Sequence, residues 1–211
     1  MIADRLAGKR VLVTGSTGFL GTALVERLLR CVPDCHIVLL VRPGRRTSAA
    51  DRVKREILRN DCFDRARQEM GDSFDTAAAE RITVIAGDVG VDGLGLDDDG
   101  RAQLAQVDVA IHSAATVSFD SPLDAAVEVN LLGPSRLAHA LAEAGSRAHL
   151  IAVSTAYVAG TRRGDAPEAL LPDTPFATSV AWQPEVAAAR RARADLDAAS
   201  RLPERLTEFH D

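Results

Sequence analysis

The chain has 211 residues and a mass of 22.4 kDa, and 46% of its residues are hydrophobic. This supplies enough apolar surface for one full core, which excludes a peptide-sized scaffold and a disordered chain. With 25 basic and 30 acidic residues the formal net charge is -5, so we expect no nucleic-acid partner.

The N-terminal region shows no targeting or membrane signal. Its longest strongly apolar run, residues 37–41, is far too short to cross a bilayer, and the first residues lack the anatomy of a signal peptide. We therefore expect a cytoplasmic protein with no integral membrane segment. The three cysteines have neither zinc nor redox spacing, so we expect no metal site and assign them to packing: Cys31, Cys35 and Cys62.

Short apolar runs alternate with longer amphipathic stretches from residue 9 to about residue 159. This alternation is typical of a parallel sheet with helices on both faces. It predicts a Rossmann-type, doubly wound α/β fold with strand order of about 3-2-1-4-5. The predicted strands are Arg10–Thr14, His36–Val41, Ile82–Ala86, Val107–His112 and His149–Ser154.

Two long segments between these strands have helical patterns. Residues 18–29 place leucines on one helical face. Residues 122–144 form a second candidate, with Ser121 as N-cap, Pro122 as the first helical residue and a bend at Pro134.

The remaining segments are less regular. Residues 61–80 are polar and predict a helix flanked by surface loops. After Gly164 the chain becomes rich in proline, and then residues 185–200 form an Ala-, Arg- and Asp-rich helix whose apolar face is weak. We predict a Rossmann domain over residues 1–163, and a linker with a helical arm over residues 164–211.

The strongest motif is a glycine-rich turn between the first strand and the first long helix. Three glycines three residues apart allow a tight turn and a close approach of pyrophosphate oxygens to backbone amides. The alternative is a merely structural turn. No lysine follows, which disfavours a P-loop. The candidate pyrophosphate residues are Gly15, Ser16, Thr17, Gly18, Phe19, Leu20 and Gly21.

Basic residues stand where an NAD-selective site would place an acidic side chain. Arg42 ends the second strand, and Arg45, Arg46 and Arg52 follow. Guanidinium groups can clamp a 2′-phosphate, so Arg42 and Arg52 predict NADP(H) over NAD(H), the alternative being a solvated basic loop. Asp88, after the third strand, is placed either to accept a hydrogen bond from adenine or to form a turn.

Taken together, these segments resemble the extended short-chain dehydrogenase/reductases, within them the branch of fatty acyl-CoA reductases, male-sterility proteins and thioester reductases. Nucleotide-sugar epimerases and dehydratases share the first turn but fit the middle segments less well. The resemblance covers about residues 9–160. It rests on VLVTGSTGFLGTALVERLL, LLVRPGRRTSAADRVKREIL, AGDVGVDGLGLDD, VDVAIHSAATVSFDSPLDAAVEVNLLGPSRLAHAL and LIAVSTAYVAG.

The resemblance implies NADPH-dependent reduction of a fatty acyl-CoA or another acyl thioester to an aldehyde or alcohol. It implies that Thr155 binds the substrate carbonyl and that Asn130 supports a proton-relay water. The alternatives are a strand-ending Thr155 and an Asn130 that satisfies backbone at a helix bend, and His112 is expected to be structural. The resemblance further implies adenine contacts from Asp88 and Val89, and contacts to the nicotinamide ribose from Ala114 and Ala115.

The Tyr-x-x-x-Lys pair of such reductases does not occur in the sequence. The single tyrosine, Tyr157, is followed at the fourth position by Thr161, and the lysines are Lys9 and Lys54. We therefore expect an incomplete form of a reductase, lacking a C-terminal portion, that binds coenzyme better than it turns over substrate. A non-catalytic NADP(H)-binding module and a nucleotide-sugar epimerase or dehydratase remain the alternatives.

Overall fold

The computed structural model describes residues 2–118, 120–155, 160, 163–170, 173–174 and 180–202. It divides into two compact units. The first comprises Met1–Ser121 and Glu128–Val153, and the second comprises Pro122–Val127 and Ser154–Asp211. The domain boundary predicted between residues 163 and 164 stays a prediction.

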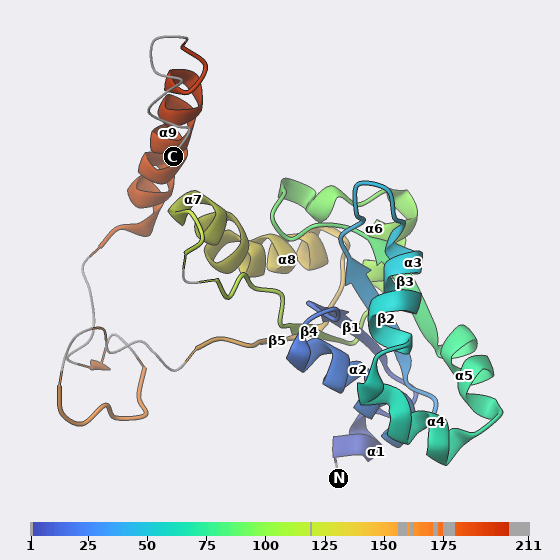
Figure 1. Cartoon of the computed structure of the whole chain (residues 1–211). Coiled ribbons are helices and arrows are strands. Elements are labelled where there is room, and N and C mark those ends of the chain that lie inside the picture. Colours follow the sequence, from blue (N-terminus) through green and yellow to red (C-terminus); the bar gives the residue numbers. More distant parts are fainter. Residues whose placement is uncertain are drawn as a thin grey trace. The chain divides into compact units, whose positions relative to one another are not determined.

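The first unit is built on five parallel strands in the order β3-β2-β1-β4-β5, which confirms the predicted fold class (Figure 1). The strands are β1 Arg10–Thr14, β2 His36–Val41, β3 Ile82–Ala86, β4 Val109–His112 and β5 His149–Ala152. β4 starts later than predicted because the Val107 amide donates to the Leu104 carbonyl instead of joining the sheet. β5 ends earlier than predicted, at Ala152.

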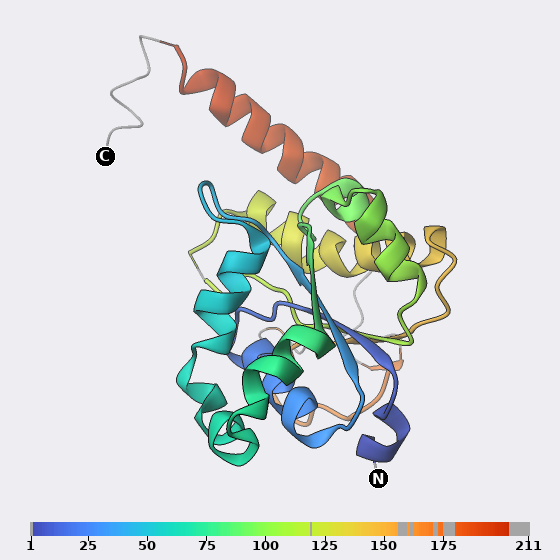
Figure 2. The same ribbon diagram turned by 90° about the vertical axis from the view of Figure 1, so that its right-hand side faces the viewer.

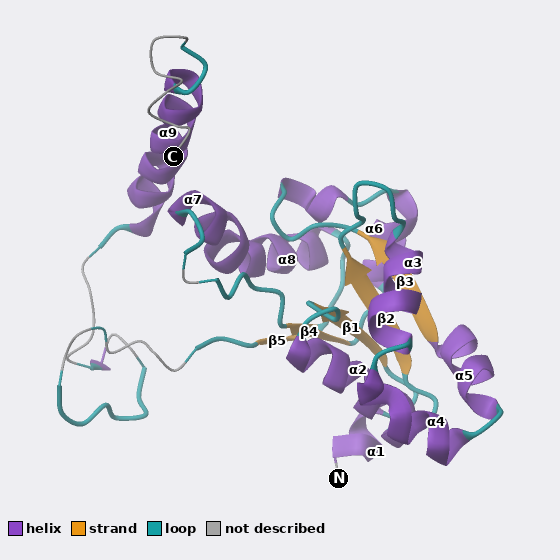
Figure 3. Ribbon diagram, viewed as in Figure 1, coloured by secondary structure: helices purple, strands orange, loops and turns teal. Residues whose placement is uncertain are grey.

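Helices join the strands and cover both faces of the sheet (Figures 2 and 3). The helical elements of the first unit up to β3 are α1 Ile2–Leu6, α2 Phe19–Cys31, α3 Ala49–Arg52, the π-helix η1 Val53–Leu58, the 3-10 helix η2 Asp61–Phe63, α4 Asp64–Met70 and α5 Ser73–Arg81. After β3 follow the 3-10 helix η3 Asp92–Gly95, α6 Asp98–Ala105, the π-helix η4 Val127–Leu131 and α8 Leu132–Glu143.

Alternate residues of β1 pack into two separate hydrophobic clusters. Val11 and Val13 of β1 pack on the face covered by α2, α3, η1, α4 and α5. Leu12 packs on the opposite face, with α6 and α8. Because side chains alternate across a strand, this single strand takes part in both cores. The helix after β1 and the helix before β5 therefore lie on opposite faces, which makes the boundary between β1 and β4 the switch point of the sheet.

The predicted helices are found, with corrections at their ends. The helix predicted for residues 18–29 is α2, Phe19–Cys31. The helix predicted for residues 122–144 begins at Leu123 with Pro122 as N-cap, so the assignment of Ser121 as N-cap was wrong by one residue. The irregularity predicted at Pro134 is found one turn earlier, as the π-helix η4. It precedes the proline because proline has no N–H to donate and its ring crowds the preceding turn.

Four helical segments of the described residues were not predicted from the sequence. They are α1, the α3–η1 pair, η3 and α6, whereas the polar region 61–80 holds η2, α4 and most of α5. The α3–η1 pair matters for the site, since it starts shortly after β2 and carries Arg52. Ser48 caps it by accepting a hydrogen bond from the Asp51 amide at 3.0 Å.

The side chain of Arg81 ties the end of α2 to the start of β2. Its guanidinium donates to four backbone carbonyls, those of Leu28, Leu29, Val32 and Cys35, at 2.6 to 3.2 Å. These carbonyls belong to the last turn of α2 and the connection that follows it, where most carbonyls have no helical partner; the Leu28 carbonyl also accepts from the Val32 amide at 3.2 Å. One partly buried side chain thus accepts no bond itself but satisfies backbone carbonyls in the connection between α2 and β2.

We expect Arg81→Met to lower the free energy of unfolding by about 2 to 4 kcal/mol, since it removes charge-assisted hydrogen bonds and leaves carbonyls unsatisfied. For a chain of this size the melting temperature should fall by roughly 5 to 15 °C. Thermal unfolding followed by circular dichroism measures it. Arg65→Met, which removes an exposed pair with Glu69, is the matched control and should change little. Equal losses for both variants would contradict the role given to Arg81.

The second unit contains the short helix α7, Leu123–Ala126, and the long helix α9, Trp182–Ala199. The helix predicted for residues 185–200 is therefore present, and Val186 is its one buried residue among those described. Arg193 lies 3.9 Å from Asp124 of α7 and 3.1 Å from Asp197. Within the described ranges, no helix is long and apolar enough to span a membrane, and no three potential ligands are grouped to hold a metal ion.

Candidate functional site

The predicted binding residues of the first unit follow the carboxyl ends of neighbouring strands. Pairing of Thr14 with both Leu40 and His112 aligns the ends of β1, β2 and β4, and Val41 pairs with Ala86 of β3. In open α/β sheets, ligands bind at this edge, in the crevice at the switch point. Here the switch point lies between the turn after β1 and the loop after β4.

The turn after β1 depends on glycine at two positions. Gly15 has φ of +70°, and a Cβ there would lie 2.6 Å from the Ala114 nitrogen. A Cβ on Gly21 would lie only 2.1 Å from the Gly15 carbonyl oxygen, well inside any real contact. The Gly18 amide donates to the same oxygen at 3.0 Å and closes the turn. The turn is therefore in direct backbone contact with both the β4 loop and α2.

The start of α2 has the features of an anion site. Gly18 is the N-cap and supplies no side-chain oxygen to the first amides of the helix, which therefore remain available to a ligand. Phe19 follows with 98% of its surface exposed. The Ser16 hydroxyl is buried and has no hydrogen-bond partner within the part of the chain that the structure describes. An unpaired buried hydroxyl beside open amides fits a diphosphate group, whose oxygens accept from both.

Buried polar groups fix the loop after β4. His112 is 2% exposed, and its Nδ1 lies 2.8 Å from Oγ1 of Thr14. The same Thr14 oxygen accepts from the Ala114 amide at 3.3 Å, and the Ser113 hydroxyl donates to the Thr14 carbonyl at 2.8 Å. Burial lowers the pKa of His112, so the ring is neutral at neutral pH. His112 thus positions the segment of Ala114 and Ala115, and the hydroxyl of Thr14 is a contributor that sequence reasoning missed.

Arg42 and Asp88 face each other across the ends of β2 and β3. Nη1 of Arg42 lies 3.6 Å from Oδ2 of Asp88, and the arginine side chain is 69% exposed. Such an exposed pair is weak, so the guanidinium can be recruited by a ligand at little cost. The other carboxylate oxygen of Asp88 accepts from the Gly90 amide at 2.8 Å, which makes Asp88 a turn-forming residue. The side chain of Val89 is buried in the core, which leaves only its backbone to face a ligand.

Arg52 is held in place by two partners. Its Nε and Nη2 donate to the carboxylate of Glu56, at 3.1 and 2.7 Å, and its Nη1 donates to the carbonyl of Arg42 at 2.6 Å. These bonds use three of the five guanidinium N–H groups, which leaves two. The hydrogen bonds from Arg52 hold the pKa of Glu56 at about 2, so the carboxylate is ionised at neutral pH. Glu56 is a second residue missed at the sequence level, although its i,i+4 spacing from Arg52 was a signal.

Asn130 lies in the π-helix η4 and contacts the β4 loop. Its side-chain oxygen accepts from the Thr116 amide at 2.8 Å, and its side-chain nitrogen donates to the Thr116 carbonyl at 2.9 Å. The amide thus fixes the loop that follows Ala115. The predicted role in a proton relay stays a prediction.

The structure brings most of the predicted residues together, but not all of them. The glycine turn, Arg42, Arg52, Asp88, Ala114 and Asn130 all belong to the first unit. Thr155 is exposed and belongs to the second unit. Tyr157, which was set aside as a proton donor, lies outside the described residues.

Comparisons with known proteins agree with this geometry. Residues 13–204 match the family model described as male sterility protein. A chloroplastic fatty acyl-CoA reductase 2 of Arabidopsis thaliana is 35% identical over 165 residues, which cover 77% of this chain and 27% of the relative. The chain spans about a third of the length of the curated plant relatives it matches.

Solved structures show the same likeness. The terminal R domain from the myxalamid PKS-NRPS biosynthetic pathway has a TM-score of 0.57 and 31% identity, over 75% of this chain and 38% of that one. The reductase domain of a non-ribosomal peptide synthetase from Mycobacterium tuberculosis has a TM-score of 0.55 and 34% identity, over 76% of this chain and 37% of that one.

Proposed function

The chain belongs to the male sterility protein family, and we propose that it is the coenzyme-binding part of an NADPH-dependent reductase of acyl thioesters. The observation that carries this proposal is the glycine turn at the switch point, where Gly15 and Gly21 leave no room for a side chain. Membership of this family supports a nicotinamide coenzyme. The geometry of the glycine turn supports binding of the coenzyme's diphosphate at the start of α2.

Different residues of the first unit would bind different parts of the coenzyme. The Gly15–Gly21 turn would hold the diphosphate, Ala114 and Ala115 the nicotinamide ribose, and Asp88 the adenine. When bound, the reduced coenzyme supplies the hydride. The chain itself would hold the coenzyme in position, because His112, Thr14 and Asn130 fix the β4 loop beside the glycine turn.

The preference for NADPH is supported by the charge at the end of β2. An exposed arginine is found where a carboxylate would accept from the ribose hydroxyls of NAD. Arg52 supports the same preference, because its anchored guanidinium keeps two N–H groups, enough for a bidentate contact to a phosphate.

We expect Glu56→Gln to weaken NADPH binding by about three- to tenfold and to leave NADH binding nearly unchanged. The neutral amide holds Arg52 less firmly, so the guanidinium spends less time beside the Arg42 carbonyl. Calorimetric titration with both coenzymes measures the change. Arg55→Gln is the matched control, since Arg55 also contacts Glu56 but its side chain is 62% exposed and makes no contact with Arg42. A loss of equal size for NADH would show that Glu56 acts only through the fold.

The substrate class rests on the relatives. Several are named fatty acyl-CoA reductases, and the similar solved structures are reductase domains of peptide and polyketide assembly lines. We propose an acyl thioester as the substrate, with the Thr155 hydroxyl donating to its carbonyl oxygen and Asn130 supporting a proton relay. A hydroxyl aimed at a developing oxyanion contributes roughly 3 to 4 kcal/mol at best.

Two measurements test the proposal. Calorimetry on the folded chain should show heat with NADPH and NADP⁺, and the absence of heat with both would overturn it. In the reductase proposed here, addition of an acyl-CoA should consume NADPH and release free thiol in parallel. NADPH binding without thioester-dependent consumption would refute the substrate class while leaving the coenzyme assignment intact.

A further inference from the structure

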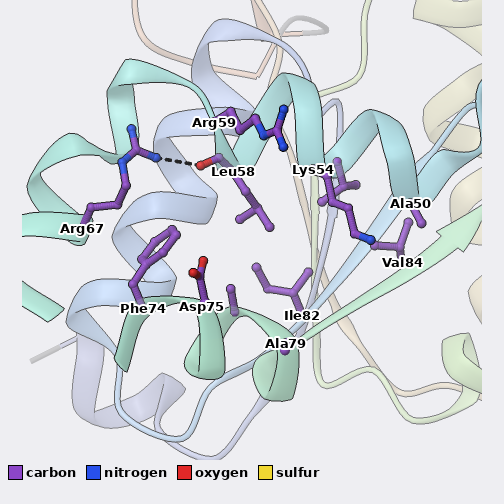
Figure 4. A pocket seen from close by; sticks show the side chains of 12 residues that line it. Ala50, Lys54, Leu58, Arg59, Arg67, Phe74, Asp75, Ala79, Ile82 and Val84 are labelled. Atoms are coloured by element: carbon purple, nitrogen blue, oxygen red, sulfur yellow. Dashed lines mark hydrogen bonds between the residues drawn. The ribbon is translucent and has the colours of Figure 1, made fainter. Parts of the chain in front are cut away.

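A groove lies on the flank of the first unit, apart from the predicted coenzyme residues. Figure 4 shows it between the helical wall of α3 and η1, the helix α5 and the strand β3. Its volume is about 610 Å³, within the range of ligand pockets. Ala50 and Leu58 stand eight residues apart on the helical wall, which makes that wall roughly 12 Å long. None of the predicted coenzyme residues lines the groove.

The inner surface of the groove is apolar. It is formed by Val53, Leu58, Phe74, Ala78, Ile82 and Val84. Arg67 borders it, with its guanidinium 5.9 Å from the centre of the Phe74 ring, and donates to the Leu58 carbonyl at 2.7 Å. Because Arg67 is also paired with Asp64, it acts as a wall of the groove and not as a free cation.

Two further cations at the groove are unpaired. Lys54 and Arg59 line it, and neither side chain has a hydrogen bond or an ion pair anywhere in the described ranges. The arginines around them are all paired with carboxylates: Arg52 and Arg55 with Glu56, Arg65 with Glu69, and Arg67 with Asp64. The positive charge without a partner in this region therefore belongs to two residues that line the groove.

We infer that the groove binds a medium-chain fatty carboxylate, with its hydrocarbon chain on the apolar surface and its carboxylate beside Lys54 and Arg59. The opposite wall carries Asp75, so two free cations and one carboxylate leave a surplus of one positive charge. That surplus matches a single negative charge and disfavours a nucleotide or another polyanion, which would also lack an apolar body. This site goes beyond the proposed function and does not depend on it.

The test uses decanoate and isotope-labelled protein. Saturable shifts of the amide signals of Val53, Ala78 and Ile82 are expected, whereas decyltrimethylammonium, with the same chain and opposite charge, should cause none. Charge reversal in the double variant Lys54→Glu/Arg59→Glu should weaken decanoate binding at least about tenfold. Ala79→Trp should abolish it, because a ring on α5 fills the groove.

Controls separate the groove from the fold and from the coenzyme. Arg55→Glu makes the same kind of charge change on the same helix but does not line the groove, and should leave decanoate binding unchanged. Circular dichroism confirms folding of each variant. The inference is overturned if wild-type protein shows no saturable shifts, if the cationic amphiphile shifts the same signals, or if the folded Lys54→Glu/Arg59→Glu and Ala79→Trp variants bind decanoate as wild type does.

Discussion

Gly21→Ala is expected to destroy coenzyme binding and to destabilise the first unit. The new Cβ would lie 2.1 Å from the Gly15 carbonyl oxygen and 2.7 Å from the Ser16 Cα, and both are backbone atoms that cannot rotate away. The turn and the start of α2 must therefore separate. We expect a loss of about 3 kcal/mol or more in the free energy of unfolding, at the upper end of overpacking effects. The amides proposed to bind the diphosphate would move with the turn, so NADPH affinity should fall at least about tenfold.

Gly133→Ala is the matched control for this prediction. Gly133 lies in α8, where a Cβ would meet the Val89 side chain at 3.5 Å, an ordinary contact. A helical Gly→Ala change is neutral or mildly stabilising, so this variant should keep both its stability and its NADPH affinity. Thermal unfolding and calorimetric titration measure the two properties. If Gly21→Ala bound NADPH as tightly as Gly133→Ala, the diphosphate would not lie on this turn.

The centre of the sheet was predictable because β1, β2 and β4 are buried on both faces. A strand such as β2, buried from Ile37 onward, must be an unbroken apolar run, and such a run bounded by turns is easy to recognise. The glycine turn was predictable for a related reason. Backbone that approaches other backbone this closely tolerates no other residue, so the spacing of Gly15, Gly18 and Gly21 reports the geometry directly.

The parts that could not be predicted depend on contacts between distant segments or on competing local bonds. The pair α3–η1 is too short to be stable on its own, and its helical form follows from the burial of Val53 and Ile57 in the core. Asn130 was placed in a bent helix, but its pairing with the Thr116 backbone needs two segments fourteen residues apart to meet. Arg52 was expected to bind a 2′-phosphate together with Arg42, yet Glu56 and the Arg42 carbonyl already accept from three of its five N–H groups.

The contacts of Arg52 also change the interpretation of the two arginines predicted to bind the 2′-phosphate. Arg42 and Arg52 are not equivalent, since one is exposed and weakly paired and the other is anchored. The exposed residue can move to a ligand, while the anchored one fixes the main chain from which the first projects. For the proposed NADPH site we therefore expect Arg42 to contribute more to phosphate selectivity than Arg52.

Arg42→Asp should accordingly weaken NADPH binding far more than NADH binding. The change replaces charge-assisted hydrogen bonds to a 2′-phosphate by repulsion, and it places a second carboxylate near Asp88. Two such bonds are worth about 3 to 5 kcal/mol, so we expect NADPH affinity to fall roughly 100-fold or more. NADH has no 2′-phosphate, and its affinity should change by less than about fivefold.

Calorimetric titration of both coenzymes at physiological ionic strength measures this ratio. Arg65→Asp is the matched control, because it makes the same charge change at an exposed position on α4. At about 0.15 M salt a surface charge acts over only about 8 Å, so that variant should bind both coenzymes normally. Equal losses of NADPH and NADH in Arg42→Asp would place the 2′-phosphate elsewhere. The selectivity would then belong to Arg45, Arg46 or Arg52, and the anchored guanidinium of Arg52 would be the next residue to replace.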